Sequence, residues 1–354
     1  MKSSSMSPRS IGLVCAASAQ GLIGAAAGVS AVLSDYPVTG GQMLRYAVAA
    51  LVLFGVLRLR RIPLLRPTRR ELVRLGLLAL CGQTLFNLFL FAALDRADPA
   101  TVGSILGATP LLLVLAAPVL GGRRPSRSVL LASLVVVAGA AVVQGLGGGT
   151  ALGLLFACGV ALCEMGFTLI AVPLLPRLGA WRIAAYATAM AIPQMLVVGA
   201  FTDGTELIRM PSGTELAALL YLALPLTAGA FLLWYSALAR IEPERAGLFM
   251  GLVPVTAALS GLVLGTGAPT AGQFGGALLV GVGVVLGMRA EREDPAEPVA
   301  PAASAGSVIP PVPLPPGTER LRGSAEEISA RPATIVGPPP TNRYSPTPPA
   351  TSAR

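Results

Sequence analysis

Two charged side chains, Arg45 and Glu164, lie well inside the long apolar runs of this chain. A charge at the middle of a bilayer costs about 3 kcal/mol on insertion scales, so an ionisable residue at that depth indicates a substrate or ion pathway. Glu164 lies thirteen residues into its run, about 20 Å along a helix and close to the bilayer midplane. We expect Glu164 to bind or couple, with a hydrogen bond to a neighbouring helix as the structural alternative. Arg45 lies four residues into its run and could bind a ligand, pair with an acid or reach the interface.

Three amide side chains within the same runs are further candidates for binding: Gln20, Gln83 and Asn87. Gln83 and Asn87 are one helical turn apart, so they share one face, and cavity lining and interhelical bonding remain equally open for them. Trp234 and Tyr235 lie near one end of a run, where the sequence predicts an aromatic belt at the membrane interface.

Several kinds of chemistry are excluded by residues that the sequence lacks. It contains no histidine, which removes histidine metal sites, Ser-His or Cys-His catalysis and a histidine proton relay. No carboxylate pair or nucleophile-base arrangement occurs within the runs. We therefore expect no catalytic residue, no metal and no cofactor. The cysteines have no metal-like spacing and are predicted to be packing residues: Cys15, Cys81, Cys158 and Cys163.

The composition is that of a membrane protein. Hydrophobic residues make up 54% and charged residues 12% of the chain, and the mean hydropathy is +0.72, whereas soluble domains carry about 25% charged residues. The net charge of +9 comes from short basic clusters between apolar runs. Because no continuous basic face results, no nucleic-acid partner is expected.

Ten apolar runs are long enough to span a bilayer as helices, which takes about 20 residues each. They lie near residues 11–33, 41–58, 75–94, 98–121, 128–147, 151–176, 183–202, 215–239, 245–265 and 269–288.

A repeat relates the first five runs to the last five. The segment ALDRADPATVGSILGATP, Ala93–Pro110, returns as ALARIEPERAGLFMGLVP, Ala237–Pro254, at a constant spacing of 144 residues. The same spacing pairs Gln20 with Glu164. Because five spans are an odd number, the halves must cross the membrane in opposite senses, which is the plan of many secondary transporters. The first run could also be a signal peptide, but its repeat equivalent lies in the middle of the chain, which argues against that interpretation.

The basic residues predict the orientation, since Lys and Arg accumulate in cytoplasmic loops. With a cytoplasmic N-terminus, only Arg96 and Arg209 lie in outer segments between the spans. The inner segments hold eighteen: Lys2, Arg9, Arg58, Arg60, Arg61, Arg66, Arg69, Arg70, Arg74, Arg123, Arg124, Arg127, Arg177, Arg182, Arg240, Arg245, Arg289 and Arg292. Both termini are therefore predicted to be cytoplasmic.

The composition changes sharply after Met288. Proline, serine, alanine and threonine dominate residues 289–354, which cannot bury enough apolar surface to offset the entropy of ordering, so a disordered cytoplasmic tail is predicted. A proline-rich stretch from Pro310 could bind an aromatic groove of a partner weakly. The domain organisation is thus a cytoplasmic N-terminus (1–10), two five-helix repeats (11–147 and 151–288) and this tail.

The repeated pattern of Ala-Leu, a short polar turn, Pro and a small residue four positions later resembles the drug/metabolite transporter superfamily, in its EamA-like branch. The resemblance extends over about residues 11–288, and Arg45 before a run of small residues is similar to that family's second helix. One departure is that the family usually has Gly-Glu after helices four and nine, where this chain has Gly121-Gly122-Arg123 and Gly265-Thr266-Gly267.

The resemblance implies a multi-pass transporter in the plasma membrane that moves a small molecule, with efflux as the expected direction. The predicted fold is all-α, with ten transmembrane helices in two inverted five-helix repeats. Alternating access with proton coupling at Glu164 is the predicted mechanism, and Gln20, Arg45, Asn87 and Gln83 are the other candidate binding or coupling residues. A flippase for a lipid-linked carrier, with the same fold, and a membrane-embedded enzyme are the alternatives.

Overall fold

The computed structural model of the protein describes residues 6–26, 29, 31–33, 35–145, 147–204, 207, 209–263 and 270–289. Over these ranges the chain is helical apart from turns and short connections, and the extended structure consists of one isolated antiparallel bridge between Ala97 and Gly149. The all-α prediction is confirmed for this part of the chain. The predicted disordered tail, with its proposed weak partner, falls on residues that lie outside the described ones.

Helical segments follow one another closely along the chain. The first half contains α1 (Pro8–Ala25), η1 (Ala31–Leu33), α3 (Val38–Leu59), α4 (Arg69–Ala79), the π-helical η2 (Leu80–Leu85), α5 (Phe86–Leu94), α6 (Pro99–Leu106), α7 (Thr109–Leu120) and α8 (Arg127–Gln144). The second half contains α9 (Ala151–Ala171), η3 (Val172–Leu174), α10 (Leu175–Thr202), α11 (Gly213–Tyr221), the π-helical η5 (Leu222–Ala230), α12 (Phe231–Leu238), α13 (Pro243–Leu248), η6 (Phe249–Gly251), α14 (Leu252–Val263) and α15 (Ala271–Arg289).

Seven helical stretches of the described chain are long and apolar enough to cross a membrane. They are Val38–Leu59, Arg69–Leu94, Pro99–Leu120, Arg127–Gln144, Ala151–Thr202, Gly213–Leu238 and Ala271–Arg289. This number is smaller than the ten predicted spans for identifiable reasons. Gly179 adopts a left-handed conformation (φ 71°) that divides the longest stretch, which covers two predicted spans. The polar residues Arg9 and Gln20 lower the hydropathy of α1, and the span predicted over 245–265 is broken into α13, η6 and α14.

Local signals explain why two of the helices begin where they do. Thr68 and Glu71 form a capping box at the start of α4, with Thr68 N donating to Glu71 Oε2 at 2.7 Å. Ser212 and Glu215 form the corresponding box at the start of α11, also at 2.7 Å. The two boxes are 144 residues apart, and the π-helical segments η2 and η5 that follow them overlap at the same spacing. The sequence repeat therefore extends to caps and to a widened helical turn.

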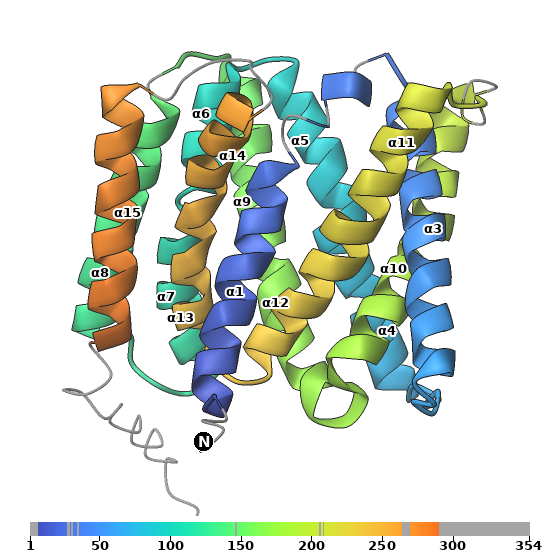
Figure 1. Ribbon diagram of the computed structural model, residues 1–354, viewed down its shortest axis with the longest axis horizontal. Coiled ribbons are helices and arrows are strands. Elements are labelled where there is room, and N and C mark those ends of the chain that lie inside the picture. Colours follow the sequence, from blue (N-terminus) through green and yellow to red (C-terminus); the bar gives the residue numbers. More distant parts are fainter. Residues whose placement is uncertain are drawn as a thin grey trace, which may run out of the picture. The chain divides into compact units, whose positions relative to one another are not determined.

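The helices pack as a bundle in which equivalent segments contact one another (Figure 1). α8 packs against α15, and α3 packs against α10. A Cβ on Gly139 would lie 2.7 Å from Val280 N, and one on Gly283 would lie 2.9 Å from Ala132 O, so glycine is required for α8 and α15 to approach this closely. α1 packs against α12 and α14, whereas α9 packs against α5, α6 and α7.

The two ends of the bundle differ in charge. We call the end at which α1 begins and α15 finishes the arginine-rich end; α4, α12 and α13 lie toward it (Figure 1). The opposite end, toward which α5, α6 and α11 lie, is the arginine-poor end. Arg123 and Arg240 belong to connections at the first end and Arg177 to the start of α10 there, whereas Arg96 and Arg209 belong to connections at the second.

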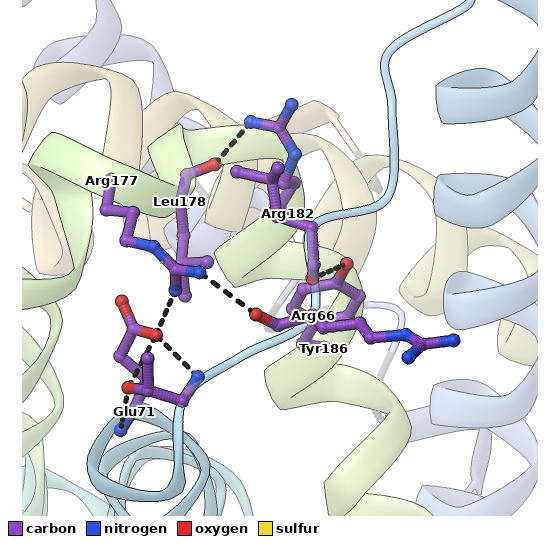
Figure 2. Close-up of polar contacts among 8 residues, drawn as sticks. Arg66, Glu71, Arg177, Leu178, Arg182 and Tyr186 are labelled. Atoms are coloured by element: carbon purple, nitrogen blue, oxygen red, sulfur yellow. Dashed lines mark hydrogen bonds and ion pairs between the residues drawn. The ribbon is translucent and has the colours of Figure 1, made fainter.

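At the arginine-rich end, side chains of α10 bind the segment that links α3 to α4 (Figure 2). Arg177 forms an ion pair with Glu71, the residue that also caps α4. The neighbouring bonds go to backbone carbonyls: Arg177 Nη2 to Arg66 O at 3.0 Å, Arg182 Nε to Pro63 O at 2.8 Å and the Tyr186 hydroxyl to Leu65 O at 2.8 Å. This network ties the two halves of the chain together.

A second cluster of charges at the same end joins the α7–α8 connection to the start of α13. Arg123 Nη1 lies 2.8 Å from Glu242 Oε1, and Arg123 Nη2 lies 2.9 Å from Glu244 Oε1. Arg245 Nε lies 3.1 Å from Glu242 Oε2. Burial raises the pKa of Glu244, although the Arg123 guanidinium acts in the opposite direction. We refer to these four residues as the Arg123 cluster.

Candidate functional site

A cavity of about 540 Å³ lies among the helices of both halves. Its lining extends from Tyr36 and the exposed Asp95, near the arginine-poor end, to Trp234 and Met250 in the interior. A volume of this size is typical of sites for small organic ligands, which are commonly several hundred Å³. Its polar wall contains Gln20, Gln42, Arg45, Asn87, Thr109, Gln144 and Glu164.

Glu164 is provided by α9, which begins at the N-cap Thr150, whose hydroxyl accepts from Gly153 N at 3.1 Å. The side chain lines the cavity and is half-buried. In the described part of the chain its carboxylate has neither a hydrogen bond nor an ion pair. Every other glutamate of the described chain is paired with an arginine: Glu71, Glu215, Glu242 and Glu244. Glu164 is thus the exception, and the interhelical bond considered in the sequence analysis is not found.

Arg45 enters the cavity from α3. Its guanidinium carbon lies 5.0 Å from the centre of the Tyr46 ring, a cation–π distance. Its Nε is buried and has no hydrogen-bond partner among the described residues. No described acid pairs with it, whereas Arg123, Arg177 and Arg209 pair with glutamates at the two ends of the bundle. A guanidinium and a carboxylate therefore line one cavity without pairing to each other.

The amide residues separate into two environments. Gln20 is nearly fully buried and lines the cavity, as Asn87 does. Asn87 Nδ2 donates to the Tyr46 hydroxyl at 2.9 Å and to the Gln83 carbonyl at 2.5 Å. This carbonyl lies within the π-helical turn over Leu80–Leu85 and also accepts from the Tyr46 hydroxyl at 3.4 Å. The side chain of Gln83, in contrast, is buried outside the cavity lining, with both Nε2 and Oε1 unpartnered in the described structure.

Aromatic residues form the apolar floor of the cavity. The ring of Phe167 lies 5.2 Å from that of Phe231 and 5.4 Å from that of Tyr235, measured between centroids. Gly82 allows this arrangement, because a Cβ there would lie 1.9 Å from the Phe167 ring. Trp234 lines the cavity, and its buried Nε1 has no partner among the described residues. We call the three rings that line the cavity, Phe167, Phe231 and Trp234, the aromatic floor; Tyr235 packs against Phe167 without lining the cavity.

The predicted interfacial belt of Trp234 and Tyr235 is therefore wrong. Trp234 is 2% exposed and Tyr235 is fully buried, and both pack in the main apolar core. The physical reason is that an amphipathic ring fits an interface and a polar cavity wall equally well, and a linear sequence does not distinguish the two.

Sequence reasoning also missed several polar residues at the site. Gln42, Thr109 and Gln144 line the cavity, and Tyr46 holds Asn87 and lies beneath Arg45. A signal for Tyr46 was present, because a tyrosine next to an arginine in an apolar run needs a partner for its hydroxyl when buried.

Long apolar helices around a cavity into which several polar side chains point are those of a multi-pass α-helical membrane protein. The chain belongs to the EamA-like transporter family, whose model matches it twice, over residues 11–144 and 151–289. This confirms the resemblance to the drug/metabolite transporters.

Individual relatives agree with this assignment. The chain is 24% identical to "Uncharacterized transporter YetK" of Bacillus subtilis (strain 168), over 71% of its own length and 79% of the relative. It is 28% identical to "Probable terminal-alkyne amino-acid exporter" of Streptantibioticus cattleyicolor, over 74% of its own length and 90% of the relative. A crystal structure of a protein that is 23% identical superposes with a TM-score of 0.71 over 80% of this chain and 99% of the other, which shows a shared fold.

Proposed function

We propose that the protein is a secondary transporter that exports a small organic molecule by alternating access, with Glu164 as the binding or coupling residue. The observation that carries this proposal is the cavity, in which the one unpaired glutamate of the described chain faces space of ligand size. The relative named as a probable exporter of an amino acid supports efflux and a substrate of comparable size.

We further propose ten transmembrane helices in two inverted repeats, 11–147 and 151–288. Support comes from the double match of the family model and from equivalent contacts made by the two halves. α1 of the first half packs against α12 and α14 of the second, and its equivalent α9 of the second half packs against α5 and α7 of the first. In this arrangement Gln20 and Glu164 occupy equivalent positions and reach one cavity from opposite halves.

In the proposed orientation both termini are cytoplasmic, and the arginine-rich end is the inner one. The cavity lining then extends toward the outer side, at Tyr36 and Asp95. The aromatic floor and the packed helices below it separate substrate from the cytoplasm in this conformation. Export requires a second conformation in which this barrier opens and the outer one closes.

In the proposed mechanism, Glu164 accepts either a proton or a group of the substrate, but not both at once. Competition of this kind couples outward movement of substrate to inward movement of protons. Gln20, Arg45 and Asn87 contact the substrate, whereas Gln83 acts through its carbonyl by positioning Asn87.

The test begins with comparison of metabolites in cells that lack and cells that overproduce the protein, followed by flux of the identified compound in vesicles with an imposed pH gradient. Glu164→Gln keeps the size of the side chain and removes its proton exchange, so gradient-driven flux should be lost. Asp35→Asn is the matched control, since Asp35 is exposed and does not line the cavity. Normal flux and normal pH dependence in Glu164→Gln would place the site elsewhere, around Arg45 and Asn87.

A further inference from the structure

A second cavity, of about 400 Å³, lies at the arginine-rich end. Among the described residues it shares none of its lining with the cavity that contains Glu164. Its walls come from segments that are distant in the sequence: the start of α1, the connection from α12 to α13, the start of α13 and the end of α15. Its charged lining residues are Arg9, Arg240, Arg245 and Glu242. We call this cavity the basic pocket.

The lining of the basic pocket has an excess of positive charge. Three guanidinium groups and one carboxylate leave two positive charges in excess. The carboxylate is shared, because Glu242 Oε1 also lies 2.8 Å from Arg123 Nη1. Arg123 and its second partner Glu244, whose Oε1 lies 2.9 Å from Arg123 Nη2, add one charge of each sign and leave the excess unchanged. A concave site of one sign concentrates ions of the opposite sign, so an anion is the expected ligand.

Backbone contacts position two of these arginines. Arg9 Nη2 donates to the Met288 carbonyl at 3.3 Å, which joins the start of α1 to the end of α15. Arg240 Nη1 donates to the Ser236 carbonyl at 2.6 Å. A Cβ at Gly12 would lie 3.0 Å from Arg240 Cβ, so the stem of Arg240 packs closely against α1. A carbonyl orients a guanidinium without changing its charge, and a guanidinium has five N–H donors.

The basic pocket lies at the level where a bilayer surface is expected. Met288 is the next-to-last residue of α15, one of the helices long and apolar enough to cross a membrane. In α1, Ile11 and Val14 are exposed apolar side chains on either side of the lining residue Leu13, and Leu286 of α15 is exposed as well. Exposed apolar side chains next to a basic pocket fit a ligand that carries both an anionic group and hydrocarbon chains.

We propose that the basic pocket binds a phosphate group, and that this group belongs to an anionic phospholipid of the membrane. The inference goes beyond the proposed function and does not depend on what the other cavity binds. Arginine binds phosphate through two parallel hydrogen bonds, and basic pockets between transmembrane helices are suited to anionic headgroups. Because the pocket joins α1, α13 and α15, a bound lipid should stabilise the packing of these helices.

Membrane orientation alone does not explain the basic pocket. Orientation depends on how many Lys and Arg residues lie near the ends of the spans. Exposed arginines such as Arg69 and Arg70, at the start of α4, satisfy that requirement equally well. It does not require Arg9 and Arg240, from opposite halves of the chain, to line one cavity.

The experiment measures thermal unfolding of the purified full-length protein in a non-ionic detergent, together with the dissociation constant of added phosphatidylglycerol. The comparison ligands are phosphatidylcholine with the same acyl chains, whose choline group offsets the phosphate charge, and the water-soluble glycerol phosphate and inorganic phosphate. We expect phosphatidylglycerol to raise the unfolding temperature most. Equal effects of the two lipids would overturn the inference. Stabilisation by the soluble phosphates as large as that by phosphatidylglycerol would contradict the assignment to a lipid.

Variants locate the binding. Arg9→Gln and Arg240→Gln should each weaken phosphatidylglycerol binding about fivefold, because each removes one cation from the pocket. Arg240→Lys keeps the charge that orientation needs and removes the paired hydrogen bonds, so it should weaken binding by a smaller factor. Arg70→Gln is the matched control, since Arg70 is exposed at the same end and does not line the pocket.

The affinity of Arg70→Gln should equal that of the unaltered protein. Equal weakening by Arg70→Gln and Arg240→Gln would show general attraction to a basic surface and would overturn the site, as would unchanged affinity in both pocket variants. The unfolding temperature without lipid identifies a variant that is misfolded. Arg240→Lys keeps the test decisive in that case, because it preserves the charge and most of the side-chain length.

Discussion

The two ends of the bundle differ in what the helices enclose: an apolar core at one end and a cavity at the other. Toward the arginine-rich end the interior is a continuous apolar core, above which lies the aromatic floor. Its fully buried side chains include Leu57, Leu75, Leu174, Leu178, Ile183 and Leu248. Toward the arginine-poor end the helices line a cavity with a guanidinium and a carboxylate that have no ion-pair partner in the described part of the chain.

Polar groups follow the same division. At the arginine-rich end, Arg123 and Arg177 bind glutamates across the two halves of the chain. In the cavity, Arg45 and Glu164 bind no charged group of the described protein. The difference indicates that one end is built to hold the helices together and the other to accept a ligand, and three further predictions test this comparison.

The largest expected effect is on chemical accessibility. In a chain whose native cysteines are replaced, cysteine at Gln42 or Asp95 should react fully with a membrane-impermeant maleimide applied to intact cells, since both positions line the cavity. Cysteine at Arg66 or Arg124 should react only after the cells are permeabilised. Reaction at Arg66 from outside would reverse the proposed orientation, and no reaction at Gln42 would mean that the cavity is closed on both sides.

A second effect concerns the boundary between the two regions. Gly82→Ala places a methyl group against the Phe167 ring, which is itself packed on Phe231 and Tyr235. Overpacking of this kind costs about 1–3 kcal/mol, and displacement of the ring into the cavity should also lower flux. Thermal unfolding in detergent and vesicle flux are the measurements.

Gly55→Ala is the control for that change. Nothing lies within 4 Å of a Cβ at Gly55, near the C-terminal end of α3. Its stability and flux should therefore stay close to those of the unaltered protein. Equal effects of the two substitutions would show that helix content, and not contact with the aromatic floor, determines the outcome.

The smallest effect is expected in the Arg123 cluster, because its groups are partly exposed and solvent screens them. Arg123→Gln leaves Glu242 and Glu244 without this cation and should destabilise the protein by about 1–2 kcal/mol at neutral pH. Burial raises the folded-state pKa of Glu244 above its unfolded value, so its contribution is present below the unfolded pKa and lost as the pH rises through the folded one.

The stability deficit of Arg123→Gln should accordingly grow as the pH rises from below the unfolded pKa of Glu244 through its raised folded pKa, because Glu244 then ionises without its partner. Unfolding temperatures of the two proteins across this range provide the measurement. The double variant Arg123→Gln with Glu244→Gln is the control and should show a smaller dependence on pH. A deficit that shrinks with rising pH would contradict the role given to Glu244.

Individual cavity-lining residues could be predicted because a polar side chain in an apolar run stands out. Glu164, Gln20, Arg45 and Asn87 were each found in this way, and the structure adds that all four line one cavity. Gln83 was paired with Asn87 on the assumption of a regular helix. The π-helical turn changes the register between them, so the Gln83 side chain leaves the cavity and its carbonyl accepts from Asn87 instead.

Composition, run length and the 144-residue repeat together determined a helical membrane protein of this family, since these properties depend on residues near one another in the chain or on simple counting. Tertiary structure alone decided which polar groups find partners. Arg123 meets Glu242 across 119 positions, whereas Glu164 and Arg45 meet no acid or base among the residues that the structure describes. Whether a charge is paired depends on the geometry of helices that are distant in sequence, because ion pairing acts only over a few ångströms.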